Sequence, residues 1–444
     1  MKNKIRIGCG AGFSGDRLEP AMILAEKGNL NYLVLECLAE RTIALAQKRR
    51  LHDPSKGYDP LLERRIELLL PLLKNNIRLI TNMGAANPVA AADKIIDIAS
   101  KQNVTIKVAA VTGDDVLEKI NPEQPAIETN APLSQSGNII SANAYLGVEA
   151  LLPALQTNAD IIITGRVADP SLFLAPMIHE FGWSPGDFDL LGKGTVIGHL
   201  MECAGQITGG YFADPVKKHV PDMAYLGHPF ADVFPDGSAV ISKVEGTGGI
   251  INLQTAKEQL LYEVTNPYEY YTPDVIADFT TVYLKEEGKD CVCVVGGTGK
   301  TKPSTYKVSV GYQAFYLGEG EISYAGSSAL GRAQLAGEIV RERLKNGFPA
   351  IRIDYIGMNS VHRTYFHQSP EPYEVRLRIS AQATTAEKAA LVGEEVEALY
   401  TNGPAGGGGV RKNVNEVVGI VSTLMERNKI QPSVTYVSHE SKVV

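Results

Sequence analysis

The first 170 residues alternate between short apolar runs and longer stretches in which hydrophobic residues recur at helical spacing. Near-continuous apolar strands separated by helices are typical of a parallel sheet that is buried on both faces. We therefore predict an α/β fold for the N-terminal half, with a mostly parallel sheet and helices on both faces. The five predicted strands are Ile5–Gly8, Tyr32–Leu35, Ile77–Ile80, Ile106–Val111 and Asp160–Ile163.

The pattern changes after about residue 210, where short β-like runs mix with predicted helices such as residues 329–345 and 387–400. At 444 residues the chain exceeds the usual size of one hydrophobic core. We therefore expect an α/β domain over residues 1–210 and a mixed α+β lobe over residues 211–444. Residues 120–145 are rich in Pro, Ser and Gly, and they predict an excursion or a lid over the first domain.

Composition narrows the function classes. The net charge of −7 gives no support to nucleic-acid binding, which needs a basic face. No apolar run approaches the roughly 20 residues of a membrane span, and the N-terminus shows no signal-peptide layout. The five cysteines form no Cys-x-x-Cys pair, which argues against a disulfide framework or a cysteine-built zinc site. We expect a cytoplasmic protein.

Each predicted strand of the first half leads into a polar turn. Ligands of parallel sheets collect at the carboxyl ends of the strands, so these turns predict one cleft. Asn82 and Asn87 follow the third strand, and Arg166 and Asp169 follow the fifth. An arginine there offers a planar fork of donors to a carboxylate or phosphate, with Asp169 to orient it. The alternative is an internal Arg–Asp pair that closes the strand end.

The turn after the first strand has two incompatible interpretations. Gly10, Gly12 and Gly15 fit Gly-x-Gly-x-x-Gly, and Glu36 follows at the end of the next strand, as in a dinucleotide fingerprint. Asp16, however, would cap the helix start itself and repel a phosphate. A tight structural turn is one alternative, and we favour a substrate-facing loop made by Gly12, Ser14, Asp16 and Arg17.

Two further segments carry candidate chemistry. His199 and Glu202 would share one helix face and form a general acid/base pair, or would simply pack as satisfied polar groups. The same pair would suit a metal, but no third ligand is evident, so no metal site is predicted. Lys243 is a candidate base or carboxylate-binding residue if desolvated, and otherwise belongs to a solvated surface strand.

Six segments, taken in order, resemble the acyclic terpene utilisation (AtuA-type) family. The resemblance covers nearly the whole chain. It implies a role near citronellol- and geraniol-type catabolism, whose intermediates are branched acyl-CoA esters, and it assigns no catalytic residue. The segments are Ile-Gly-Cys-Gly-Ala-Gly-Phe-Ser-Gly-Asp-Arg (7–17), Tyr-Leu-Val-Leu-Glu-Cys-Leu-Ala-Glu (32–40), Asn-Met-Gly-Ala-Ala-Asn-Pro (82–88), Thr-Gly-Arg-Val-Ala-Asp (164–169), Glu-Cys-Ala-Gly-Gln-Ile-Thr-Gly-Gly-Tyr (202–211) and Asn-Gly-Pro-Ala-Gly-Gly-Gly-Gly (402–409).

The resemblance also raises the question of a partner. Many relatives carry a further C-terminal ferredoxin-like domain of about a hundred residues, whereas this chain stops at Val444. The large-subunit form that lacks this domain implies a separate small ferredoxin-like partner protein and a hetero-oligomer. Such relatives sit beside a short companion in gene clusters that degrade branched dicarboxylic acids.

These observations together predict a hydro-lyase of carboxylic-acid catabolism that adds or eliminates water beside a carboxylate or thioester. Arg17 and Arg166 would clamp the carboxylate, and Glu202 or His199 would act as acid and base, with Lys243 as a further candidate. No cofactor is predicted, while a divalent metal and a CoA thioester substrate stay open. One alternative is an acyl-CoA-processing enzyme that binds CoA through Arg411 and Lys412; the other is a non-catalytic scaffold or activating subunit.

Overall fold

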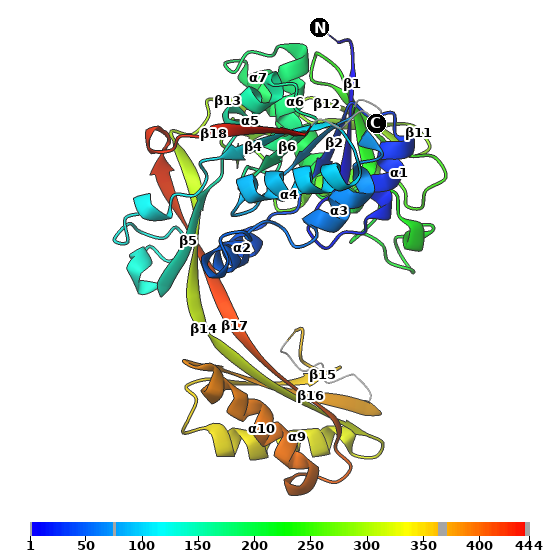
Figure 1. Cartoon of the computed structure of the whole chain (residues 1–444). Coiled ribbons are helices and arrows are strands. Elements are labelled where there is room, and N and C mark those ends of the chain that lie inside the picture. Colours follow the sequence, from blue (N-terminus) through cyan, green and yellow to red (C-terminus); the bar gives the residue numbers. More distant parts are fainter. Residues whose placement is uncertain (1, 74–76, 363–370, 440–444) are drawn as a thin grey trace. The chain divides into compact units, whose positions relative to one another are not determined.

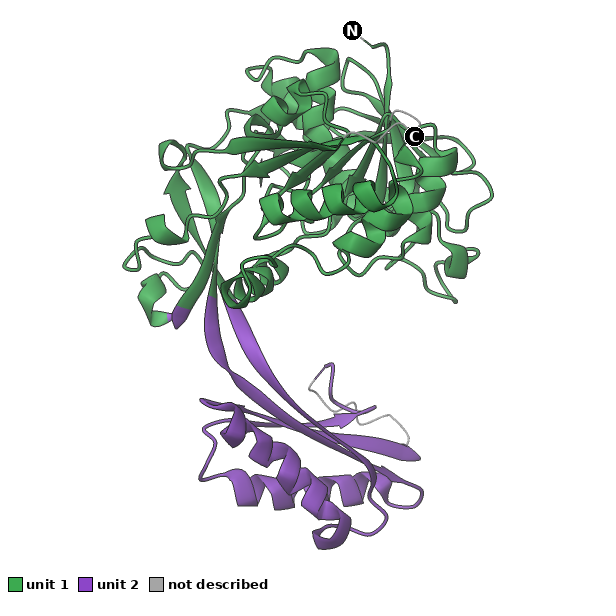
Figure 2. Cartoon of the chain, viewed as in Figure 1, with its two compact units in different colours: residues 1–135, 139–311, 420–444 green, residues 136–138, 312–419 purple. Residues whose placement is uncertain are grey.

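The structure of the chain is a computed structural model that describes residues 2–73, 77–362 and 371–439. The chain divides into two compact units (Figure 2). Unit 1 contains residues 1–135, 139–311 and 420–444, and unit 2 contains residues 136–138 and 312–419. The expected boundary at residue 210 lies inside unit 1 and does not coincide with this division, because residues 211–311 add strands to the sheet that the first half begins.

Five parallel strands form the centre of a ten-stranded sheet in unit 1. Each overlaps one of the five predicted apolar runs, so the parallel core is confirmed. All four residues of the strand Tyr32–Leu35 are buried, and so are all four of the strand Ile161–Thr164, as expected for strands that are covered on both faces. In spatial order they are β1 (Ile5–Ala11), β2 (Tyr32–Leu35), β3 (Arg78–Thr81), β6 (Ile161–Thr164) and β4 (Ile106–Thr112).

Antiparallel strands extend this core at both edges. The sheet is therefore mixed, and the prediction of a mostly parallel sheet is wrong. The reason is local connectivity: β7 and β8 are joined by a short turn around Gly237, which has φ of +79°, and such a turn can only link antiparallel neighbours. The added strands are β7 (Pro229–Val233), β8 (Ala239–Lys243), β12 (Cys291–Val295) and β11 (Tyr283–Gly288) beside β1, and β18 (Ser433–His439) beside β4.

Helices cover both faces of the sheet, as predicted (Figure 1). On one face Ala91, Ile95 and Ile98 pack with Val108 and Ile161 of the strands. On the other face α6 lies between the sheet and α7 and is buried almost throughout. The first layer consists of α1 (Glu19–Lys27), α3 (Leu62–Leu69) and α4 (Pro88–Lys101), and the second of α5 (Val148–Gln156), α6 (Ser171–Phe181) and α7 (Phe188–Glu202).

The remaining elements of unit 1 surround the carboxyl ends of the strands. A small sheet of order β13-β10-β9 packs against α7. The segment expected to be an excursion contains β5, which pairs with β14, and the sequence pattern did not predict this strand. The elements are α2 (Glu40–His52), β5 (Asn138–Ala144), α8 (Leu253–Leu261), β9 (Tyr270–Tyr271), β10 (Ile276–Asp278) and β13 (Thr298–Lys300).

Unit 2 has the β-α-β-β-α-β connectivity of a ferredoxin-like fold. Its sheet has the order β15-β16-β14-β17. Val375, Leu377 and Ile379 of β16 point toward the two helices and form the core, while Arg378, between them in the sequence, pairs with Asp354 at 2.7 Å. The elements are β14 (Thr305–Ala325), α9 (Ala329–Leu344), β15 (Ile351–Ile356), β16 (Glu374–Ala383), α10 (Ala386–Asn402) and β17 (Gly408–Glu426), and the division into units cuts β14 and β17.

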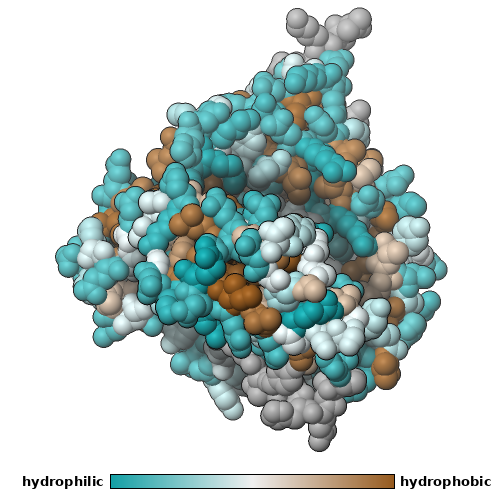
Figure 3. Space-filling model, turned by 90° about the horizontal axis from the view of Figure 1, so that it is seen from below, coloured by the Kyte–Doolittle hydropathy of each residue, from teal (hydrophilic) through white to brown (hydrophobic). Residues whose placement is uncertain are grey.

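The surface carries no continuous apolar belt in the view of Figure 3, where hydrophobic residues form separate groups among polar ones. Within the part of the chain that the structure describes, none of the helices has both the length and the apolar composition to cross a bilayer.

Candidate active site

A cavity of about 760 Å³ lies in unit 1 at the carboxyl ends of the parallel strands. The turns after β1, β2 and β6 line it through Gly12, Glu36, Arg166 and Asp169. The turns after β3 and β4 support it from behind. Asn82 Nδ2 donates a hydrogen bond to Glu36 Oε1 at 2.8 Å, and an Asp114 carboxylate oxygen accepts one from the Arg166 backbone at 2.9 Å. The strand-end cleft predicted from the sequence is therefore present.

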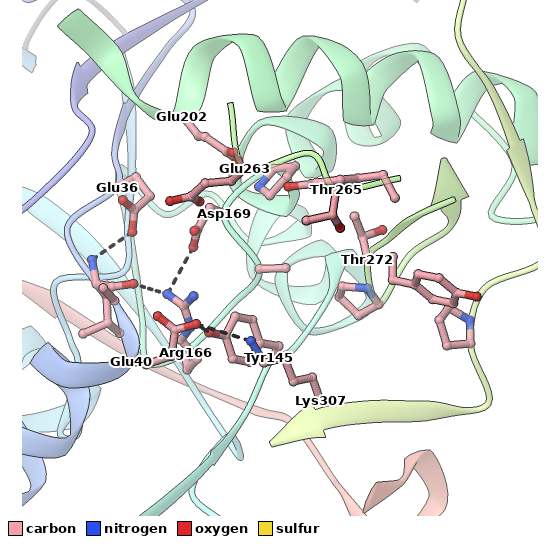
Figure 4. A pocket seen from close by; sticks show the side chains of 18 of the residues that line it. Glu36, Glu40, Tyr145, Arg166, Asp169, Glu202, Glu263, Thr265, Thr272 and Lys307 are labelled. Carbon is pink, nitrogen blue, oxygen red and sulfur yellow. Dashed lines mark hydrogen bonds and ion pairs between the residues drawn. The ribbon is translucent and has the colours of Figure 1, made fainter. Parts of the chain in front are cut away.

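The other walls come from segments that the sequence did not connect with the cleft. Glu202 and Cys203 enter from the end of α7, and Tyr145 follows β5. Figure 4 shows Glu36, Asp169, Glu202 and Glu263 gathered on one side, with Arg166, Tyr145 and Lys307 on the other. Several residues that line the cavity were not predicted from the sequence to be site residues. They include Glu36, Glu40, Tyr145, Glu263, Glu269, Tyr270 and Lys307.

Arg166 is buried and already paired. Its guanidinium donates to the Leu38 carbonyl, lies 3.1 Å from Asp169 Oδ1 and stacks on the Tyr145 ring at 4.0 Å. Its Nε is buried and has no hydrogen-bond partner among the residues that the structure describes. Both interpretations of this arginine therefore meet in the structure: it forms the internal Arg–Asp pair and it also faces the cavity.

Glu40 forms a second cluster with Tyr145 and Lys307. Its Oε1 accepts a hydrogen bond from the Tyr145 hydroxyl and lies 3.4 Å from Lys307 Nζ. Burial alone would raise the pKa of Glu40, but the positive charge of Arg166 and the Tyr145 hydroxyl outweigh it and hold that pKa at about 2. Glu40 is therefore a carboxylate at any physiological pH.

Three other carboxyl groups show the opposite behaviour. Glu36 and Glu202 are only 7% and 8% exposed. Burial, reinforced by the negative charge of Asp169, raises the pKa of each well above its usual range. Burial also raises the pKa of Asp169, although Arg166 opposes the shift. Carboxyl groups whose pKa is raised in a cleft are candidates for proton transfer near neutral pH.

His199 holds Glu202 in place. Its Nδ1 lies 2.9 Å from Glu202 Oε1, and its ring packs against Tyr270 and Phe279. Burial lowers the pKa of His199 to about 4, so the imidazole is neutral. His199 does not line the cavity itself. The predicted pair of His199 and Glu202 exists, with the carboxyl group as the member that reaches the cavity.

The glycine loop packs closely against the site instead of leaving a phosphate cradle. A Cβ at Gly12 would lie 2.4 Å from the Cys203 carbonyl carbon. Asp16 Oδ2 accepts hydrogen bonds from the N–H groups of Gly12 and Phe13 at 2.7 and 3.2 Å, so the donors that a phosphate would use are taken. The expectation that Asp16 caps the following helix is wrong, because α1 begins only at Glu19.

Several predicted site residues lie outside the cavity lining. Ser14 accepts a hydrogen bond from buried Arg65 through its carbonyl, and Arg17 binds the carbonyls of residues 223 and 224. Asn87 caps α4. Lys243, on β8, donates to the Thr247 carbonyl at 2.8 Å and lies 3.3 Å from Asp290. Of the predicted residues, the structure brings together Gly12, Arg166, Asp169 and Glu202 in the lining, with Asn82 and His199 behind them.

The comparisons with known proteins agree with the sequence resemblance. The model of the family described as "Acyclic terpene utilisation family protein AtuA" matches residues 5–436. The chain belongs to the AtuA family. No curated protein and no solved structure matches it. Unit 2 lies inside the matched region, so its ferredoxin-like fold is part of the AtuA region itself.

Two of the ligands left open by the sequence can be compared with the geometry. Among the described residues, no three His, Cys, Asp or Glu side chains are arranged to hold a metal ion. Arg411 and Lys412 lie on β17 in unit 2, where Lys412 pairs with Glu397 at 2.6 Å.

Proposed function

We propose that this AtuA-family protein is a hydro-lyase that adds water to, or removes it from, an acyclic branched or unsaturated carboxylic acid or its thioester. The observation that carries the proposal is the gathering of buried Glu36, buried Glu202 and half-buried Asp169 at one cavity, each with a raised pKa. Dehydration needs one group to accept a proton from carbon and another to give a proton to the departing hydroxyl. Carboxyl groups whose pKa is raised can take either role.

Asp169 and Glu202 fit these two roles. The positive charge of Arg166 favours the ionised form of Asp169, so Asp169 is the base that takes the proton from the carbon next to the carbonyl group. Glu202, in the neutral pair with His199, is the acid. The C–O bond breaks, the hydroxyl leaves as water with the proton of Glu202, and the C=C bond forms. Hydration is the reverse.

Several features of the proposal go beyond the cavity. The small ferredoxin-like partner, the oligomer and a cytoplasmic location stay part of it as expectations from the sequence. An acyl-CoA-processing role uses the same cavity and the same acid/base groups. A non-catalytic subunit, in contrast, would tolerate the loss of Glu202 without a change in the activity of its complex.

The test is a Glu202→Gln variant, which keeps the size of the side chain and removes its proton. With branched unsaturated acids and their thioesters as substrates, we expect the rate of loss of the conjugated C=C absorbance to fall by roughly 10²–10⁴-fold. The matched control is Glu258→Gln, an exposed partner of Lys218, which should keep the wild-type rate. Both proteins are assayed alone and with the companion protein. Equal rates in the two variants would contradict the proposal.

A further inference from the structure

The charges of the cavity restrict the form in which an acyl group can enter. Within the described residues, six carboxyl-bearing side chains line the cavity against two cationic ones, Arg166 and Lys307. An anionic ligand is favoured only where positive charge is available to it. A free carboxylate would therefore need one of the two cations to be available.

Both cations already have anionic partners. Arg166 pairs with Asp169, and its charge also stabilises Glu40. Lys307 pairs with Glu40 at 3.4 Å, and both cations face the ring of Tyr145, at 4.0 and 4.8 Å. Glu40 therefore interacts with both cations, and the hydroxyl of Tyr145 fixes it in that position.

We propose that Glu40 is a specificity-determining residue that makes the cavity accept an acyl group as an uncharged carbonyl derivative, such as a thioester or ester, and reject the free carboxylate. This inference rests on the proposed function only in that the site takes an acyl group. The apolar lining residues Ile127, Leu424, Pro273 and Pro303 then provide a wall for the hydrocarbon part.

The experiment measures binding, so that it does not depend on turnover. The probes are a series of branched 2-enoic acids of four to ten carbons and their N-acetylcysteamine thioesters, which carry no phosphate and no charge. By calorimetric titration at pH 8, we expect the wild-type protein to bind the thioester at least about tenfold more tightly than the matched acid. The Glu40→Gln variant should bind the acid at least about tenfold more tightly than the wild type does, with thioester affinity nearly unchanged.

Two further variants make the result specific. Glu269→Gln removes another lining carboxylate, but one that pairs with Lys300 and not with Arg166 or Lys307, so it should keep the wild-type preference. Glu40→Asp keeps the negative charge and should also keep the wild-type preference for the thioester. This variant therefore distinguishes an effect of the charge from an effect of a disturbed fold. Equal gains in acid binding for Glu40→Gln and Glu269→Gln would overturn the inference. So would wild-type protein that prefers the acids or binds neither series. A clear thioester preference without any hydration activity would instead count against the proposed reaction alone.

Discussion

Two glutamates of the same cavity, Glu40 and Glu202, have pKa values that the protein shifts in opposite directions: that of Glu40 is lowered and that of Glu202 is raised. Glu40 is the first residue of α2, where the positive end of the helix dipole favours an anion, and Arg166, Tyr145 and Lys307 surround it. Glu202 is the last residue of α7, at the negative end of the dipole, beside a neutral imidazole. The same type of side chain is therefore favoured as an anion at one helix start and as a neutral acid at one helix end.

The largest expected effect comes from removing the cation that this difference depends on. Arg166→Met leaves Asp169 and Glu40 without their shared positive charge in a buried site. We expect a loss of about 3–5 kcal/mol in the free energy of unfolding of unit 1, measured by urea denaturation, because the substitution removes the buried cation of the pair and leaves Asp169 without it. The control variant Arg17→Met replaces an exposed arginine and should lower the free energy of unfolding by at most about 0.5 kcal/mol. If the two variants lost equal stability, the charges of the cavity would not be coupled as described.

The fold was predictable where burial leaves a continuous signature. The central strands β1, β2, β3, β6 and β4 are apolar along almost their whole length because helices cover both faces, and all five were predicted. Two of the other strands have no such signature: β11 is mostly exposed and polar, and β5 begins with one exposed and two half-buried residues. Which strand pairs with which edge depends on tertiary contacts that no local pattern contains.

The site divides in the same way. Arg166 and Asp169 follow a buried strand, and this position alone pointed to the cleft. Glu36 follows β2 in the same manner, so the same rule applied to it would have found it. Tyr145 follows β5 and Lys307 lies on β14, both far along the chain, and no spacing relates them to Glu40. The sequence predicted that Arg166 binds a substrate carboxylate. It did not predict that Arg166 stabilises the carboxylate of Glu40, because only the folded chain brings the two residues together.

A carboxyl group outside the cavity isolates the effect of burial. Asp114 lies behind Arg166, and burial raises its pKa from 3.8 to about 6. Because the folded-state pKa is the higher one, the associated stability is complete below about pH 4 and is lost as the pH rises through 6. The Asp114→Asn variant has no carboxyl group to titrate at this position, so this loss should disappear. From pH 4 to pH 7, its free energy of unfolding should therefore decrease by roughly 3 kcal/mol less than that of the wild type.

The measurement is a series of denaturation curves across that pH range. Asp115→Asn is the control, since this neighbour is 38% exposed and pairs with Arg50 at the surface. It should keep the wild-type slope. An unchanged slope in Asp114→Asn would show that burial does not hold these carboxyl groups in the protonated form, and the difference between Glu40 and Glu202 would then need another cause.

The smallest effect is expected from a substitution that disturbs the cavity only beside Glu202. In Gly12→Ala the new Cβ would lie 2.4 Å from the carbonyl carbon of Cys203, the residue after Glu202, and backbone atoms there must shift. We expect a loss of about 1–3 kcal/mol in stability, from overpacking, and a lower hydration rate. The preference for thioester over acid should remain, because Glu40 lies on a different element. Gly331→Ala, which meets no atom within 4 Å in α9, should instead stabilise the protein by about 0.5–1 kcal/mol. A Gly12→Ala variant that altered the acid preference as strongly as the rate would mean that the two glutamates act as one group.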